Sequence, residues 1–230
     1  VSLENGAFSF TAEYLKEMYS ADYIESFLDS LDCMLTQLTS KEMLEQISLL
    51  DDTSARILEN INSTERNFEN IPAHRLFERY AAEHPNQTAV ICNKRSISYD
   101  ELNRLANRLA HKLIRYGAGK DSIIGIMLDR SVGLDIAEIG ILKSGGAFLG
   151  LLPDYPDDRI GFCLEDAGST IVITTRAIQQ ARPELLGKDK PYRTLLLEEI
   201  ISEGNDANPE IGISQDSLAY CIYTSGSTGN

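Results

Sequence analysis

The sequence predicts an α/β fold: a layered, mainly parallel β-sheet with flanking helices, preceded by a short N-terminal strand-helix segment. Short apolar runs that are typical of buried strands alternate with segments whose apolar residues recur every three or four positions. Strand, helix and strand in this order form a βαβ unit, and its right-handed crossover makes the sheet parallel. The strands that we expect in the larger part of the chain are 88–92, 95–98, 123–128, 147–152, 170–174, 193–197 and 218–222.

Residues 1–50 contain one expected strand and one long helix. Apolar and polar side chains alternate over 8–14, which is the period of a half-buried strand. Over 22–38 the apolar residues recur at helical spacing instead, and acidic residues cover the opposite, solvated face. Residues 51–71 are polar and rich in Asn, so we expect them to form an interdomain linker. Within it, residues 55–61 could form one helical turn.

From residue 72 onward the helical segments have start and stop signals. Pro72 suits a first helical turn, and Ser98 with Glu101 has the spacing of a capping box. Glycines that can adopt a left-handed conformation follow the helical segments and end them, at Gly117 or Gly119, Gly145-Gly146 and Gly168. The expected helices are 72–84, 99–116, 134–144, 158–167 and 175–187, and 203–208 form a surface loop. The apolar stripe of the first of these helices is Leu76, Phe77, Tyr80 and Ala81.

The composition excludes several classes of function. The formal charge is −14, and residues 1–74 alone carry 14 acidic and 4 basic side chains, so we expect no nucleic-acid partner. The chain has no secretory signal and no run of about 18 apolar residues, so we expect no membrane contact and a cytoplasmic location. The four cysteines and three histidines have no metal-ligand spacing, so we interpret the cysteines as core thiols and predict no metal site.

The last expected strand, 218–222, continues into a loop of hydroxyls and glycines, Tyr-Thr-Ser-Gly-Ser-Thr-Gly-Asn. Glycines let the backbone approach a ligand, so that successive N–H groups can converge on an anion, and the hydroxyls add donors. The P-loop of nucleotide hydrolases requires Lys after its last Gly, whereas here Asn230 follows Gly229, so that interpretation fails. From composition alone, a flexible Ser/Gly turn and a phosphate site both stay open, and the turn is favoured.

Three segments resemble core motifs of the adenylate-forming superfamily, most closely those of nonribosomal peptide synthetase adenylation domains. They are Ser-Tyr-Asp-Glu-Leu at 98–102, Leu-Lys-Ser-Gly-Gly-Ala-Phe-Leu at 142–149 and Leu-Ala-Tyr-Cys-Ile-Tyr-Thr-Ser-Gly-Ser-Thr-Gly at 218–229. The motifs stand in the family's order, and the last is its phosphate-binding motif. Gly150 and Leu152 depart from the Pro and Asp of the family, which affects local packing more than chemistry.

The resemblance implies an incomplete N-terminal subdomain of an adenylating ligase. Such enzymes use ATP and Mg²⁺ to convert a carboxylic substrate, here an amino acid, into an acyl adenylate, and then load the acyl group onto the phosphopantetheine of a carrier domain. The family's carboxylate anchor, adenine contacts and catalytic Lys lie beyond this motif, so we assign no catalytic residue and expect the fragment alone to be inactive. Lys143, at a helix C-terminus, and Tyr223, at a strand end, are interpreted as structural. The residues implied to contact ATP phosphates are Thr224, Ser225, Gly226, Ser227, Thr228 and Gly229.

The front of the chain resembles the tail of a condensation domain, without the paired-His motif of such domains. We therefore divide the chain into a condensation-like tail at 1–50, a linker at 51–71 and a truncated adenylation domain at 72–230. The expected partners are the carrier and condensation domains of the same assembly line. Two alternatives stay open: an acyl-CoA or aryl-acid ligase of the same superfamily, and a non-catalytic docking scaffold.

Overall fold

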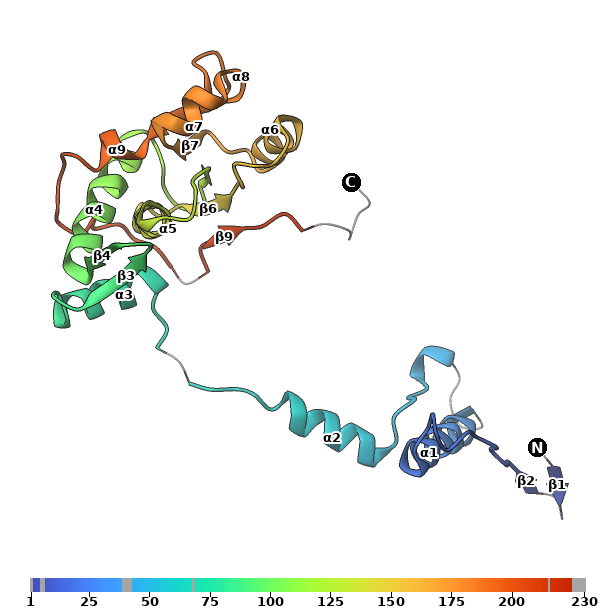
Figure 1. The fold of residues 1–230 in the computed structure, drawn as a ribbon. Helices are drawn as coiled ribbons and strands as arrows, with labels where there is room; N and C mark the ends of the chain where they lie inside the picture. The colour runs from blue at the N-terminus through green and yellow to red at the C-terminus, as the bar shows by residue number, and fades with distance from the viewer. Residues whose placement is uncertain (1, 5–6, 39–42, 68, 215, 225–230) are drawn as a thin grey trace. The chain divides into compact units, whose positions relative to one another are not determined.

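The chain forms two compact units (Figure 1). The computed structural model describes residues 2–4, 7–38, 43–67, 69–214 and 216–224. The first unit is Val1–Phe68 and the second is Glu69–Asn230.

The first unit contains a small hairpin and two helices. Its elements are β1 (Ser2–Glu4), β2 (Ala7–Ser9), α1 (Ala21–Leu38), the 3-10 helix η1 (Leu44–Gln46) and α2 (Asp52–Asn62). α1 confirms the helix expected at 22–38, whereas the strand expected at 8–14 ends at Ser9, where its antiparallel pairing with β1 ends. α2 is longer than the single turn expected, because the Asp51 carboxylate caps it by accepting the Ser54 N–H at 2.6 Å.

A five-stranded sheet organises the second unit. Its strands are β5 (Ile123–Ile126), β6 (Ala147–Gly150), β7 (Ile171–Thr174), β8 (Arg193–Leu196) and β9 (Tyr220–Cys221). They lie in the order β8-β7-β5-β6-β9, and every neighbouring pair is parallel. The parallel sheet expected from the βαβ pattern is thereby confirmed. A separate antiparallel hairpin, β3 (Thr88–Cys92) with β4 (Arg95–Ser98), turns at Asn93, whose φ is 56°.

Helices cover both faces of the sheet (Figure 1). They are α3 (Ala73–Glu83), α4 (Tyr99–Arg115), α5 (Val132–Lys143), α6 (Asp157–Asp166), α7 (Arg176–Ala181), α8 (Pro183–Leu186) and α9 (Leu197–Ile200). One apolar core joins Leu109 of α4 and Ile141 of α5 to Ile124 of β5. A second core joins Ile160 of α6 to Val172 of β7. Strands buried on both faces explain the continuous apolar runs in the sequence.

The connections from β5 and β6, which are neighbours in the sheet, leave toward opposite faces. α5 follows β5 and belongs to the first core, whereas α6 follows β6 and belongs to the second. In open α/β sheets such a divergence opens a crevice at the carboxyl ends of the strands, where ligands bind. β9 runs parallel to β6, with Phe148 opposite Tyr220 and Leu149 opposite Cys221. The chain beyond β9 therefore leaves the sheet at this carboxyl edge.

Gly146, between α5 and β6, is predicted to tolerate no side chain. A Cβ here would lie 2.8 Å from the Ser122 carbonyl oxygen, which already accepts the Ala147 N–H at 2.9 Å. We expect Gly146→Ala to lower the free energy of unfolding by about 1–3 kcal/mol in urea denaturation. Gly161→Ala in α6 is the matched control, because its Cβ would meet open space and should raise stability by up to about 1 kcal/mol. Wild-type stability of Gly146→Ala would show that this contact does not constrain the glycine.

Candidate phosphate-binding edge of the sheet

The end of β9 is anchored to α6 through Tyr223. The Tyr223 hydroxyl donates to Asp166 Oδ2 at 2.6 Å, and its ring meets the Phe162 ring edge-on with the ring centres 6.2 Å apart. Burial, together with the hydrogen bond to the Asp166 carboxylate, raises the pKa of the Tyr223 phenol. The prediction that Tyr223 is a packing residue at the strand end is confirmed. It holds the chain at the point where the hydroxyl-rich loop begins.

Only the first of the predicted phosphate-binding residues is part of the described structure. Thr224 follows Tyr223 and is exposed. The other predicted residues lie outside the described ranges, so their role stays a prediction; they are Ser225, Gly226, Ser227, Thr228 and Gly229. The described geometry establishes the starting point of the loop, at the carboxyl edge of the sheet next to β6.

Lys143 is structural, as predicted, but its main partner is a carboxylate rather than the end of its own helix. Its side chain is completely buried, and its Nζ lies 2.6 Å from Glu78 Oε1 of α3. The ammonium also donates to Asn208 Oδ1 at 2.9 Å. Burial lowers the pKa of Lys143, although the hydrogen bond from the ammonium to Glu78 opposes this shift. A lysine held in this way is not free to contact a nucleotide.

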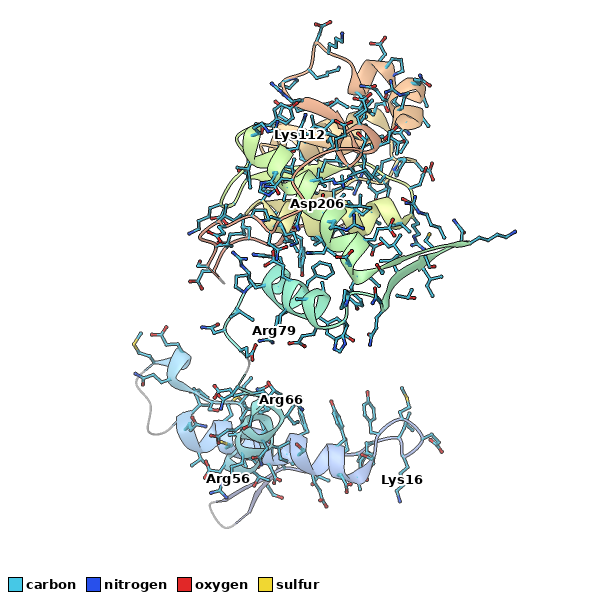
Figure 2. The ribbon with its side chains drawn as sticks, turned by 90° about the vertical axis from the view of Figure 1, so that its left-hand side faces the viewer. Lys16, Arg56, Arg66, Arg79, Lys112 and Asp206 are labelled. Atoms are coloured by element: carbon cyan, nitrogen blue, oxygen red, sulfur yellow. The ribbon has the colours of Figure 1, made fainter. Side chains whose placement is uncertain are left out.

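Asn208 belongs to a segment, residues 203–208, that we call the strap. The predicted surface loop is confirmed, because the strap has no regular secondary structure and is mostly exposed, and it is in addition fastened to α4. Arg108 Nε donates to Asp206 Oδ1 at 2.6 Å, and Asn107 Nδ2 donates to Asn208 Oδ1 at 3.0 Å. Asp206 is labelled in Figure 2. The ion pair lowers the pKa of Asp206 and raises that of Arg108. These contacts were missed because a composition rich in Gly, Asn and Asp carries no information on distant partners.

The buried face of α3 also differs from the predicted stripe. Leu76 and Tyr80 are exposed, whereas His74, Glu78 and Ala81 are buried. These three residues recur at helical spacing, which was the available signal for a polar buried face. Burial lowers the pKa of the His74 imidazole. Within the part of the chain that the structure describes, no three His, Cys, Asp or Glu side chains gather into a possible metal site.

Comparison with known proteins identifies relatives of this chain. The profile of the family described as "AMP-binding enzyme" matches residues 77–230. Tyrocidine synthase 3 of Brevibacillus parabrevis is 35% identical over 224 residues, which are 96% of this chain and 3% of that protein. Zwittermicin A synthase ZmaJ of Bacillus cereus is 39% identical over 155 residues, which are 67% of this chain and 29% of that protein. The chain therefore spans a small part of the length of these relatives.

The fold is shared with solved nonribosomal peptide synthetases. The AMPPNP-bound form of the nonribosomal peptide synthetase FmoA3 superposes with a TM-score of 0.73 at 26% identity, covering 88% of this chain and 22% of that one. The predicted fold class, a layered and mainly parallel sheet with flanking helices of the adenylate-forming type, is thus confirmed.

The Lys143–Glu78 pair predicts a strong, non-additive effect on stability. We expect Glu78→Leu to lower the free energy of unfolding of the 230-residue chain by about 3–5 kcal/mol, because it leaves a buried ammonium unpaired. Adding Lys143→Met should restore most of that loss. Urea denaturation of both variants provides the measurement, with Glu83→Leu on the exposed end of α3 as the control. Additive losses in the double variant would contradict a direct pairing.

His74 predicts a loss of stability in mild acid. Because burial lowers its folded-state pKa, the unfolded chain binds more protons than the folded chain as the pH falls below about 6.5, the ordinary value for histidine. The free energy of unfolding should therefore decrease as the pH falls from about 7.5 to about 5.5, and His74→Phe should show a smaller decrease. Identical pH profiles for the two proteins would mean that His74 titrates normally.

Proposed function

The chain belongs to the AMP-binding enzyme family, and we propose that it is part of a nonribosomal peptide synthetase that activates an amino acid as aminoacyl-AMP. The observation that supports this proposal most directly is the family match over residues 77–230. The matched range includes the sheet and the strand that leads to the predicted loop. The relatives include tyrocidine synthase 3, and FmoA3, a nonribosomal peptide synthetase of the same fold, binds the ATP analogue AMPPNP. The activated amino acid would then pass to phosphopantetheine on a carrier domain.

The loop after β9 would hold the triphosphate of ATP. Attack of the amino-acid carboxylate on the α-phosphorus places charge on the departing pyrophosphate, and donors aimed at its oxygens stabilise the transition state. The proposed donors are the hydroxyls of Thr224, Ser225, Ser227 and Thr228, with Gly226 and Gly229 keeping the backbone amides accessible. This donor set fits phosphate oxygens. It contains no carboxylate for Mg²⁺, which would reach the site with the nucleotide.

The 230-residue chain is proposed to lack the rest of the site. The carboxylate anchor, the adenine contacts and the catalytic Lys are expected from a more distant part of the protein. The apolar side chains at alternate positions on and beside β9 are all exposed, which favours a further layer of protein over this face; they are Leu218, Tyr220 and Ile222. We therefore propose that the fragment alone forms no aminoacyl adenylate.

The first unit is proposed to connect the adenylation domain to a preceding condensation domain. The proposed division is a condensation-like tail at 1–50, a linker at 51–71 and the adenylation part from 72 onward. None of the described residues in α1 or α2 is buried, and large apolar side chains such as Phe27 and Ile57 are exposed, which suits a surface that docks another domain.

No described helix is long and apolar enough to span a membrane. We propose a cytoplasmic location.

A loop variant in the longer synthetase tests the proposed function. Removing two phosphate donors with Ser227→Ala/Thr228→Ala should lower amino-acid-dependent ATP–pyrophosphate exchange by at least about 10²-fold, because the leaving group loses its stabilising donors. Ser96→Ala, which removes an exposed hydroxyl on β4, is the control and should retain full exchange. The isolated 230-residue chain should give no exchange above background.

Undiminished exchange in the folded double variant would reject the loop as the triphosphate site. Exchange by the isolated chain would show that the site is complete within these residues. Exchange driven by aryl or fatty acids and not by amino acids would instead assign the protein to another branch of the superfamily.

A further inference from the structure

Strand β8 forms one edge of the described sheet. Within the residues described, it pairs with β7 alone. The Arg193 N–H donates to the Thr170 carbonyl oxygen of the segment before β7 at 2.8 Å. Since successive residues of a strand direct their backbone groups to opposite sides, the N–H and C=O groups of Thr194 and the N–H of Leu196 point away from β7. The Leu196 carbonyl belongs to the N-cap of α9 and is used by that helix. The outer side of β8 thus offers donors and acceptors to an additional strand.

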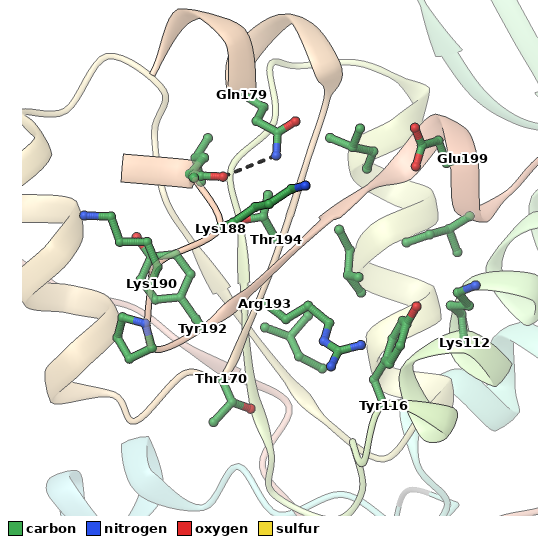
Figure 3. Close-up of a pocket in the computed structure, with 17 residues that line it drawn as sticks. Lys112, Tyr116, Thr170, Gln179, Lys188, Lys190, Tyr192, Arg193, Thr194 and Glu199 are labelled. Carbon is green, nitrogen blue, oxygen red and sulfur yellow. Dashed lines mark hydrogen bonds between the residues drawn. The ribbon is translucent and has the colours of Figure 1, made fainter. Parts of the chain in front are cut away.

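A cavity of about 830 Å³ lies along this edge (Figure 3). Residues of β8 form part of its wall, and others come from the end of α4 and from the connection between α8 and β8. Thr194 is one of the wall residues, and its Oγ1, which is shielded from solvent, has no hydrogen-bond partner among the described residues. The groove therefore has unpaired backbone groups along its wall, and one wall residue carries an unsatisfied hydroxyl.

The groove is positively charged although the chain as a whole is acidic. Four cations line it: Lys112, Lys188, Lys190 and Arg193. Glu199 is the only carboxylate among the lining residues, and it is paired with Arg176 outside the groove. The formal charge of the whole chain is −14, so the groove has the opposite sign of charge to the chain as a whole.

One aromatic ring orders two of these cations. The Arg193 guanidinium lies 4.3 Å from the centre of the Tyr116 ring, and the Lys112 ammonium lies 5.5 Å from the same centre. Such contacts hold cations in place without neutralising them. Figure 3 shows Arg193, Lys112 and Tyr116 grouped at one side of the groove and Lys190 at the other. An anionic partner would therefore meet positive charge on both sides of the strand.

We propose that this groove, the β8 groove, binds an extended acidic peptide segment of a partner as an additional strand beside β8. The main chain of the peptide would pair with the N–H and C=O of Thr194 and with the N–H of Leu196, which gives affinity for any extended segment. Carboxylates on its alternating side chains would meet Arg193 and Lys112 on one face and Lys188 and Lys190 on the other. Acidic peptides are selected over basic ones because like charges repel at these positions.

The test uses the folded 230-residue chain and a short fluorescent peptide of alternating Glu and Val. Fluorescence anisotropy should show saturable binding that weakens with added salt, and a Lys–Val peptide should not bind. The same Glu–Val peptide with N-methylated backbone amides keeps its charge but cannot pair as a strand, so its binding should be lost. Hydrogen exchange should slow at the amides of Thr194 and Leu196 when the Glu–Val peptide is bound.

Three variants locate the site. Lys188→Glu/Lys190→Glu, at exposed positions, should weaken binding by at least about tenfold, whereas Lys94→Glu/Lys120→Glu changes the net charge equally outside the groove and should not. Thr194→Pro removes an outward-pointing N–H that β7 does not use and should also abolish binding. No binding of the Glu–Val peptide, equal binding of its N-methylated form, or equal weakening by both charge reversals would overturn the proposal. In those cases the lysines would serve only to protect an exposed sheet edge.

Discussion

The buried pair of Lys143 and Glu78 is the constraint on which the second unit depends. Two charges placed out of water need close partners, and each supplies one for the other at 2.6 Å. Glu78 uses its second oxygen to accept from Arg75 at 2.8 Å, and Asn208 accepts from the Lys143 ammonium. The pair joins residues 65 positions apart in the chain. It therefore fixes α3, α5 and the strap together in one arrangement.

This arrangement bears directly on the edge where the nucleotide is proposed to bind. α5 leads into β6, and the strap leads toward β9, so the two strands next to the proposed site follow segments that the pair holds. Tyr223 adds a second anchor through Asp166, two residues beyond the end of β9. A loop that must place several donors around a triphosphate benefits from such a rigid origin, because donors positioned in advance need no rearrangement during the reaction.

Local sequence patterns predicted most helices and strands of the second unit. They did not predict the contacts between residues that are far apart in the sequence. The Ser98 hydroxyl does accept the Glu101 N–H at 3.2 Å, and Gly117, Gly145 and Gly168 end helices with positive φ. Those features depend on residues close in sequence. The sheet order and the attachment of the strap depend on partners far away in the sequence, which no periodicity encodes. The buried face of α3 does have helical spacing, but it includes His74 and Glu78, so a search for apolar residues missed it. The site residues were predicted through a family resemblance, because a Ser/Gly-rich stretch has no unique structure on composition alone.

The most direct test of this account is a structure of the longer synthetase with AMPPNP and Mg²⁺ bound. We expect the β- and γ-phosphates to lie within hydrogen-bonding distance of the backbone amides and hydroxyls between Thr224 and Gly229, at the carboxyl end of β9. A triphosphate bound elsewhere, with this segment turned away from it, would contradict the central claim.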